Sequence, residues 1–268
     1  MTRKSFPKKS LGQNYLIDEN ISRKIVNAFK IRKDDFVIEI GPGKGAITKY
    51  IEQNTGNFVA VELDEDNCTY LEKSMPGLKL INADFLKTDL LKLVKQFDTH
   101  NKTENWVPLI RVIGNIPYNI TSEILFKLID NRSYLKDALL MIQEEVAQRL
   151  VAEPDSKIYG ITSVFTQVFT NPKLLFKVSK NCFFPKTGVD SRLIYFEFNN
   201  KLENDITDLN LFKKTVRLSF GTRRKTLKNS LSKIGFGINN IDFDFSRRAE
   251  TLSVSEFIFL SNQFSKCK

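Results

Sequence analysis

Four consecutive residues, Asn115 to Tyr118, place an amide, a carbonyl group before a proline, and an aromatic ring together where a short apolar run ends. The amide oxygen of Asn115 and the carbonyl oxygen of Ile116 can accept both hydrogens of one amine. Pro117 restricts Ile116 and has no N–H, so it holds that carbonyl in one direction. Tyr118 offers a ring on which a flat heterocycle can stack. These residues predict a site for an aromatic amine; the simpler alternative is a turn between a strand and a helix.

The exocyclic amine of adenine is a weak nucleophile because its lone pair is delocalised into the ring. Hydrogen bonds to Asn115 and Ile116 would draw its hydrogens out of the ring plane and direct the lone pair at an electrophile. A sulfonium methyl group is already activated, so orientation and two hydrogen bonds suffice. We therefore predict that Asn115, Ile116 and Tyr118 are catalytic, with Tyr118 stacking on an adenine drawn out of a folded nucleic acid. No metal site is predicted, and His100 is the only histidine.

A glycine-rich loop with Gly41, Gly43 and Gly45 follows the predicted strand 36–41 and leads into a predicted helix. Glycine lets the backbone turn sharply and lets a ligand approach closely. The loop satisfies a loose dinucleotide fingerprint, so an NAD enzyme is one alternative, and a tight turn that binds nothing is another. The Gly-x-Gly-x-Gly form, and Pro42, which removes one N–H, favour S-adenosylmethionine as a ligand without a pyrophosphate.

Two carboxylates end the next two predicted strands. Glu62 lies at the place where an acid can bind ribose hydroxyls. Asp84 can accept a hydrogen bond from an adenine amine, or it can cap the helix that follows. Because the carboxyl ends of parallel strands line one crevice in an open α/β sheet, we expect Gly41, Glu62, Asp84 and Asn115 to surround one ligand.

Apolar runs alternate with helical patterns through the first 200 residues, which predicts βαβ units and a parallel sheet covered by helices. We expect a catalytic α/β domain over residues 1–200, with a basic lead at 1–16, and a small helical domain over 201–268. Predicted strands cover 36–41, 58–64, 78–84, 109–115 and 137–142, with a later hairpin of 172–179 and 189–198; predicted helices cover 17–29 (capped by Asp18), 46–54, 64–75, 121–130, 143–152, 210–220, 223–234 and 253–264.

The formal charge of +10 is uneven: residues 1–33 carry +7 and residues 201–268 carry +6, whereas the body between them is net negative. Two basic ends favour a polyanionic partner such as nucleic acid. Three cysteines without metal-ligand spacing predict a reducing, cytoplasmic location. No apolar run is long enough to span a membrane, so no membrane partner is predicted, and nothing requires more than a monomer.

Ten segments in order carry a resemblance: LGQNYL, EIGPGKGAIT, VELD, NAD, GNIPYNITS, IQEEVAQRLVA, YGITSV, VDS, RRKTLKNSL and RAETLS. Together they resemble the ribosomal RNA adenine N6,N6-dimethyltransferase family, specifically its small-subunit branch, over nearly the whole chain. The resemblance implies a Rossmann-like, class I S-adenosylmethionine-dependent methyltransferase fold, with a small all-α C-terminal domain.

The resemblance also implies site residues. Phe183 matches an aromatic residue that encloses the target base with Tyr118, and Phe184 is the alternative register. RNA phosphates would be neutralised by Arg223, Arg224, Lys225 and Lys228. The residues that match cofactor-contacting positions are Asn14, Leu16, Gly41, Gly43, Glu62, Asp84 and Asn115.

The function implied is methyl transfer from S-adenosylmethionine to two adjacent adenosines in the 3′-terminal hairpin of small-subunit rRNA, within immature 30S subunits. One alternative is the related macrolide-resistance enzyme, which methylates large-subunit rRNA and shares the NIPYN motif. The other is an assembly factor that has kept the fold and lost catalysis. The C-terminal segments RRKTLKNSL and RAETLS favour the small-subunit branch, and the intact motifs argue against a silent factor.

Overall fold

The structure, a computed structural model, describes residues 7–98, 109–198, 201–222, 224–235 and 241–267. The chain divides into two compact units. The first unit consists of Met1–Ala147 and Lys173–Phe198, and the second of Gln148–Pro172 and Asn199–Lys268. Among the described residues, no helix is long and apolar enough to cross a membrane.

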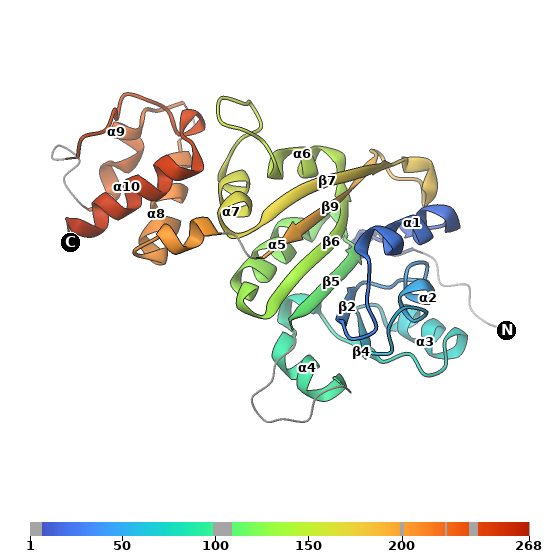
Figure 1. The fold of residues 1–268 in the computed structure, drawn as a ribbon. Coiled ribbons are helices and arrows are strands. Elements are labelled where there is room, and N and C mark those ends of the chain that lie inside the picture. Colours follow the sequence, from blue (N-terminus) through green and yellow to red (C-terminus); the bar gives the residue numbers. More distant parts are fainter. Residues whose placement is uncertain (1–6, 99–108, 199–200, 223, 236–240, 268) are drawn as a thin grey trace. The chain divides into compact units, whose positions relative to one another are not determined.

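A seven-stranded sheet organises the first unit, in the order β4-β3-β2-β5-β6-β9-β7 (Figure 1). The strands β2 to β6 run parallel, whereas β9 is antiparallel to β6. All seven predicted strands are confirmed, with small differences at their ends. Their bounds are β2 Phe36–Ile40, β3 Phe58–Glu62, β4 Leu80–Asn82, β5 Ile110–Asn115, β6 Leu135–Gln143, β7 Asn171–Val178 and β9 Ser191–Glu197.

The order of the strands reverses between β2 and β5. From β2 the chain moves outward to β3 and β4, and it then returns to the other side of β2 to form β5 and β6. At such a reversal the loops after the two central strands lead apart and leave a crevice at the carboxyl edge. The first glycine of the loop, Gly41, and the last residue of β5, Asn115, therefore lie at that crevice.

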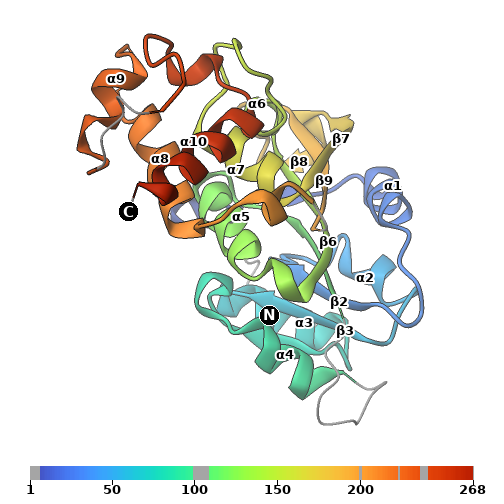
Figure 2. The ribbon, with the colours of Figure 1, turned by 60° about the vertical axis from the view of Figure 1, so that its left-hand side comes forward.

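Helices cover both sides of this sheet, with α1 and α2 on one side and α5 on the other (Figure 2). Apolar residues of α1 and α2 pack on the sheet in one buried core cluster that includes Phe29, Ile51 and Ile113. Asp18 caps α1 as predicted, accepting from the backbone N–H of Asn20 and Ile21. The bounds are α1 Glu19–Phe29, α2 Thr48–Ile51, α3 Glu65–Ser74, α4 Leu90–Phe97, α5 Thr121–Asp130 and α6 Glu144–Leu150.

The second unit is helical, with α7 (Ile161–Phe169), α8 (Leu209–Phe220) and α10 (Val254–Lys266) packed together in both views (Figures 1 and 2). It includes residues 148–172, which the sequence analysis assigns to the catalytic domain. The reason is aromatic packing: the rings of Phe165 and Phe169 meet the ring of Phe212 edge-on, at centroid distances of 6.0 and 6.3 Å.

Two predicted helices are wrong in their extent: 46–54 is reduced to α2, Thr48–Ile51, and 223–234 is also shortened. A short helix, α9, covers only Leu227–Ser230, and a 3₁₀ turn follows it. The backbone N–H groups of Leu227 and Lys228 donate to the carbonyls of Arg247 and Phe245 at 2.8 and 2.9 Å. Because the first N–H groups of a helix have no partner within it, pairing with this distant segment fixes where α9 begins.

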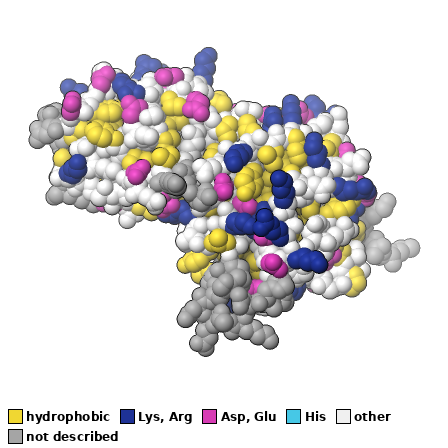
Figure 3. Space-filling view, viewed as in Figure 1, with side chains coloured by type: hydrophobic (Ala, Val, Ile, Leu, Met, Phe, Trp, Pro, Cys, Tyr) yellow, Lys and Arg dark blue, Asp and Glu magenta, His cyan; other side chains and the backbone are white. Residues whose placement is uncertain are grey.

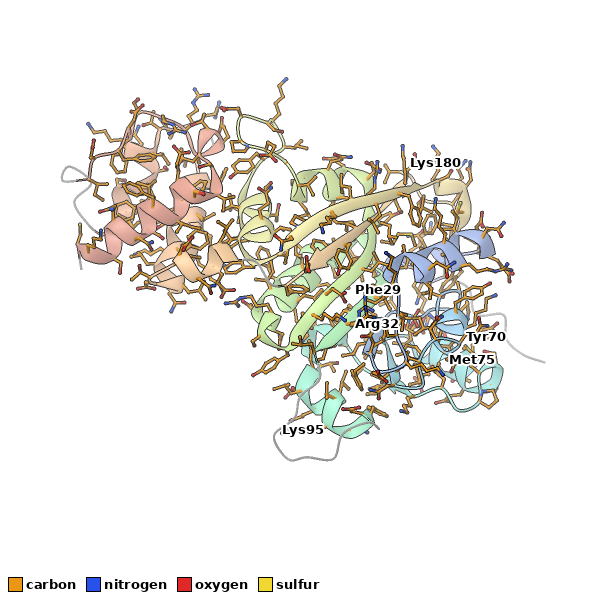
Figure 4. All side chains as sticks on the ribbon, in the orientation of Figure 1. Phe29, Arg32, Tyr70, Met75, Lys95 and Lys180 are labelled. Atoms are coloured by element: carbon orange, nitrogen blue, oxygen red, sulfur yellow. The ribbon has the colours of Figure 1, made fainter. Side chains whose placement is uncertain are left out.

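A buried arginine on β5 joins the sheet to α1. Both oxygens of Asp137 accept from the Arg111 guanidinium at 2.8 Å, and the carbonyl of Phe29 accepts at 2.7 Å. Asp35 is a third partner. The guanidinium also lies 4.1 Å from the ring centroid of Phe29, which Figure 4 labels at the end of α1. Since α1 follows directly on the N-terminal segment, these contacts fix one side of the site.

Replacing Arg111 with Met should lower the free energy of unfolding by about 3–5 kcal/mol, because it leaves the buried carboxylate of Asp137 without its cation. Urea denaturation of the full chain measures this. Lys136→Met is the control: Lys136 is exposed and lies 3.4 Å from Asp35, so its loss should cost no more than about 1 kcal/mol. Similar small losses in both variants would contradict a supporting role for Arg111.

Candidate cofactor and catalytic site

One pocket at the carboxyl edge of the sheet is lined by the predicted cofactor-binding and catalytic residues of the first unit. It is formed by the segment before α1, the glycine loop after β2, the ends of β3 and β4, and the turn after β5. We call it the strand-end pocket. The predicted residues that line it are Asn14, Leu16, Gly41, Gly43, Glu62, Asp84, Asn115, Ile116 and Tyr118.

The glycine loop is held against Glu62. The backbone N–H of Gly43 donates to Glu62 Oε2 at 3.0 Å, and the N–H of Asp64 donates to Oε1 at 2.8 Å. Gly41 has a φ of 63°, a left-handed conformation that favours glycine. A Cβ atom at Gly41 would meet nothing within 4 Å. The loop therefore turns sharply and leaves room above Gly41 for a ligand.

A second carboxylate, Glu39, lies within β2 and lines the same pocket. Its side chain is 1% exposed, and its Oε2 has no hydrogen-bond partner in the described structure. Burial raises the pKa of Glu39 to about 8, and the nearby charge of Glu62 acts in the same direction. A buried acceptor without a partner is rare and indicates that a donor from a ligand belongs there.

Asn115 is oriented by the segment before α1. Its Nδ2 donates to the carbonyl oxygen of Asn14 at 2.9 Å. A carbonyl accepts only from the nitrogen end of an amide, so this contact leaves Oδ1 of Asn115 as the acceptor for a ligand. Hydrogen bonds also fix Ile116 and Tyr118. The N–H of Ile116 donates to Met141 at 3.0 Å, and the hydroxyl of Tyr118 lies 2.8 Å from that of Ser191.

Phe183 is the one predicted pocket residue that the structure places elsewhere. Its side chain is 3% exposed and belongs to the buried core cluster, and it does not line the strand-end pocket. The cause is a two-stranded sheet in which β8 (Phe183–Phe184) pairs with β1 (Tyr15–Leu16), so that Phe183 lies opposite Leu16. The alternative, Phe184, is 53% exposed.

The predicted RNA-binding residues belong to the second unit. Arg224, Lys225 and Lys228 are exposed in the segment where α9 begins. Arg223 lies outside the described residues. This basic segment is thus open to solvent, as a phosphate-binding surface has to be.

The lining of the pocket fits S-adenosylmethionine. This cofactor carries a sulfonium, an ammonium group, ribose hydroxyls and an adenine amine, which are cations or hydrogen-bond donors. The carboxylates of Glu62 and Asp84 and the buried carboxyl group of Glu39 are matching acceptors, and Lys44 is the basic residue in the described lining. A dinucleotide would bring a pyrophosphate toward the carboxylates of Glu62 and Asp84, which like-charge repulsion disfavours.

The sheet order and this pocket define a class I S-adenosylmethionine-dependent methyltransferase fold. Two solved structures share it. The dimethyladenosine transferase of Plasmodium falciparum has a TM-score of 0.74 at 23% identity, over 94% of this chain and 97% of that chain. The 23S rRNA methyltransferase ErmE has a TM-score of 0.63 at 20% identity, over 94% and 99%. At these identities the likeness shows the fold alone.

A family model described as "Ribosomal RNA adenine dimethylase" matches residues 5–258, and the chain belongs to this family. Two relatives carry the name ribosomal RNA small subunit methyltransferase A. The one from Chlorobium phaeobacteroides is 43% identical over 257 residues, which is 96% of this chain and 90% of the relative. The one from Francisella tularensis subsp. novicida is 40% identical over 272 residues, which is 99% of this chain and all of the relative. The predicted fold class, enzyme class and methyl donor are thereby confirmed.

Sequence reasoning missed two groups that shape the site. Glu39 is a single acid inside the apolar run 36–40, and that isolation was the available signal. Ser191 follows the segment that joins β8 and β9, and no local pattern ties it to Tyr118. The contact between Tyr118 and Ser191 joins residues that lie 73 positions apart in the sequence, and the burial of Glu39 depends on its place in the sheet, so only the fold reveals them.

Replacing Glu39 with Gln should remove a pH-dependent cost of folding. Between pH 4.5 and about 8 the folded protein retains a proton on Glu39 that the unfolded chain releases, so this group makes the wild type less stable as pH rises. Relative to the wild type, the free energy of unfolding of the variant should therefore rise by up to a few kcal/mol across that range. Urea unfolding at pH 5, 7 and 9 measures the difference, with the exposed Glu72→Gln as control. Parallel curves for wild type and Glu39→Gln would contradict a buried proton.

Proposed function

We propose that this protein transfers methyl groups from S-adenosylmethionine to the N6 amines of two adjacent adenosines in the 3′-terminal hairpin of small-subunit rRNA. The products are N6,N6-dimethyladenosines in 30S subunits under assembly. The observation that carries the proposal is the arrangement of Asn115, Ile116 and Tyr118 at the same pocket as the glycine loop and Glu62. The names of the two relatives support the small subunit as the substrate.

The roles of the residues follow from their contacts. When bound, the cofactor supplies an electrophilic methyl group. Asn115 Oδ1 and the Ile116 carbonyl accept the two N6 hydrogens, which directs the nitrogen lone pair away from the ring plane. Tyr118 stacks on the adenine, and its contact with Ser191 keeps the ring in place. One N6 hydrogen leaves as a proton for each methyl group transferred.

The second aromatic residue of the base site is Phe184 in this proposal. Phe184 is 53% exposed and lies opposite Tyr15, a residue of the pocket lining, in the pairing of β1 with β8. Phe183 is part of the core and would have to leave it before it could contact a base. The sequence match to Phe183 and the exposure of Phe184 thus point to different residues.

Exposed positive charges support an RNA partner. Lys and Arg side chains are spread over the face of the first unit that Figure 3 shows. In the second unit Arg224, Lys225 and Lys228 are exposed. Subunit assembly as the setting of this activity implies a cytoplasmic location, and the three free cysteines are in keeping with a reducing compartment. We keep the monomer as the proposed state.

Asn115→Ala tests the proposal. The variant should bind small-subunit particles nearly as the wild type does and should transfer methyl groups at least about 10²-fold more slowly, because one oriented acceptor of the target amine is lost. Methyl-labelled cofactor and immature small subunits measure both quantities. Asn54→Ala is a matched control, because it also removes one side-chain hydrogen bond to a backbone carbonyl, on the surface near α2.

Two outcomes would refute the proposal. Undiminished transfer by Asn115→Ala would remove the role given to the amide. Tight particle binding by a wild-type protein that transfers no label would identify a silent assembly factor instead.

Charge reversal of Arg224 and Lys228 to Glu should weaken RNA binding and flatten its dependence on salt, because fewer counterions are released. The slope of log affinity against log salt should fall by roughly one to two. Reversal of Lys92 and Lys95, two exposed residues of α4, changes the net charge equally and should leave the slope nearly unchanged. If the α4 pair flattens the slope and the Arg224 pair does not, the RNA contact lies on the first unit.

A further inference from the structure

The residues Lys8–Leu16, which we call the N-terminal strap, are tied to the first unit at both ends. At the carboxyl end, Tyr15 and Leu16 pair with Phe184 and Phe183. At the other end, Lys8 Nζ lies 2.6 Å from Asp64 Oδ1 and 2.7 Å from Asp66 Oδ2. Between these ties, residues 11–16 line the strand-end pocket. The strap therefore forms one wall of the pocket.

Asp64 is the residue to which the Lys8 end of the strap is bound. Its side chain is 0% exposed. Beyond the contact with Lys8, its Oδ2 accepts from Gln13 Nε2 at 2.6 Å, and its Oδ1 caps α3 by accepting from the N–H of Asp66 at 3.1 Å. A buried carboxylate is costly unless it is paired and hydrogen-bonded, so Lys8 and Gln13 are held firmly against it.

Gln13 links the two halves of the strap. Its Oε1 accepts from the backbone N–H of Lys8 at 2.7 Å and lies 2.9 Å from the hydroxyl of Tyr15. The Tyr15 hydroxyl is also 3.0 Å from Asn67 Oδ1, at the start of α3. With its neighbours held on both sides, the backbone of Asn14 has little freedom to move.

The strap contacts residues 115–119, the turn after β5, at two points. The Asn14 carbonyl accepts from Asn115 Nδ2 at 2.9 Å. Gly12 has a φ of 62°, and a Cβ atom there would lie 2.7 Å from Asn119 Oδ1. The left-handed φ favours glycine at this position, and the close approach to Asn119 brings the strap against the residues that follow Asn115.

We infer that Lys8, Gln13 and Asp64 are positioning residues for methyl transfer. They hold the Asn14 carbonyl against Asn115 Nδ2, and so they keep Asn115 Oδ1 directed at the target amine. The inference rests on the proposed function. Lys8 is outside the pocket lining, so its effect on the site passes through the strap.

Lys8→Met tests the inference at saturating cofactor and RNA in single turnover. The rate should fall by roughly tenfold to a hundredfold, the scale expected when a reacting group is misplaced by about 1 Å. Lys8→Arg keeps the charge and should restore most of the rate. Lys49→Met is the matched control. Lys49 is also 41% exposed and also lies 2.7 Å from a carboxylate, that of Glu19, outside the pocket lining.

A double-mutant cycle separates positioning from general damage. In the Asn115→Ala background, Lys8→Met should reduce the remaining rate less than about twofold, because the group that it positions is gone. An equal loss in both backgrounds would mean that the ion pair acts on the fold as a whole. No loss in either background, or a similar loss from Lys49→Met, would also overturn the inference.

A measurement that does not depend on catalysis tests the inference separately from the proposed function. Nuclear magnetic resonance of the cofactor-free full chain should show the side-chain amide of Asn115 as a dispersed, slowly exchanging pair of signals. Lys8→Met should move these signals toward the values of a free amide and speed their exchange, and Lys8→Arg should not. If wild-type protein transfers no methyl groups but these shifts occur, the proposed function fails while the positioning contact stands. Unchanged Asn115 signals in Lys8→Met would overturn the contact itself.

Discussion

The close pairing of β2 with β5 is the constraint on which the site depends. Ile40 lies opposite Gly114, and a Cβ atom at Gly114 would come within 2.8 Å of the Ile40 carbonyl oxygen. Only glycine lets these strands pair at their carboxyl ends. The loop after β2 begins at Gly41, and β5 ends at Asn115. This pairing therefore sets the distance between the glycine loop and the side-chain amide of Asn115.

The buried acids of the pocket lower the stability of the protein without ligand and at the same time match the charge of the expected ligand. Glu39 is buried without a partner for one oxygen, and Glu62 is 6% exposed with a pKa that burial raises. Each carboxylate makes the protein without ligand less stable than an apolar residue would. Bound S-adenosylmethionine would offset part of that cost, because its ammonium and ribose hydroxyl groups can donate hydrogen bonds to these oxygens. The charge of Glu62 also disfavours a pyrophosphate, so the acidic lining favours a cationic ligand over a dinucleotide.

Local sequence patterns predicted the elements that nearby residues determine. The helix Thr121–Asp130 has its predicted bounds. The residues at or just after the ends of four parallel strands line one pocket, as that topology requires: Gly41, Glu62, Asp84 and Asn115. Long-range pairing was not predictable. The two-residue pairing of β1 with β8 has no periodicity to detect, and it buries Phe183. Packing of α7 on α8 likewise assigns residues 148–172 to the second unit. The role of Asn14 came from family resemblance, and only the structure revealed its hydrogen bond to Asn115.

The most direct test of the account is the identity of the modified nucleosides. Wild-type protein would be incubated with S-adenosylmethionine and either immature small subunits or naked large-subunit rRNA, and the digested RNA analysed by mass spectrometry. The account predicts N6,N6-dimethyladenosine at two adjacent positions in the 3′-terminal hairpin of the small-subunit rRNA and none in the large-subunit rRNA. Dimethyladenosine in the large-subunit rRNA alone, or in neither RNA, would contradict it.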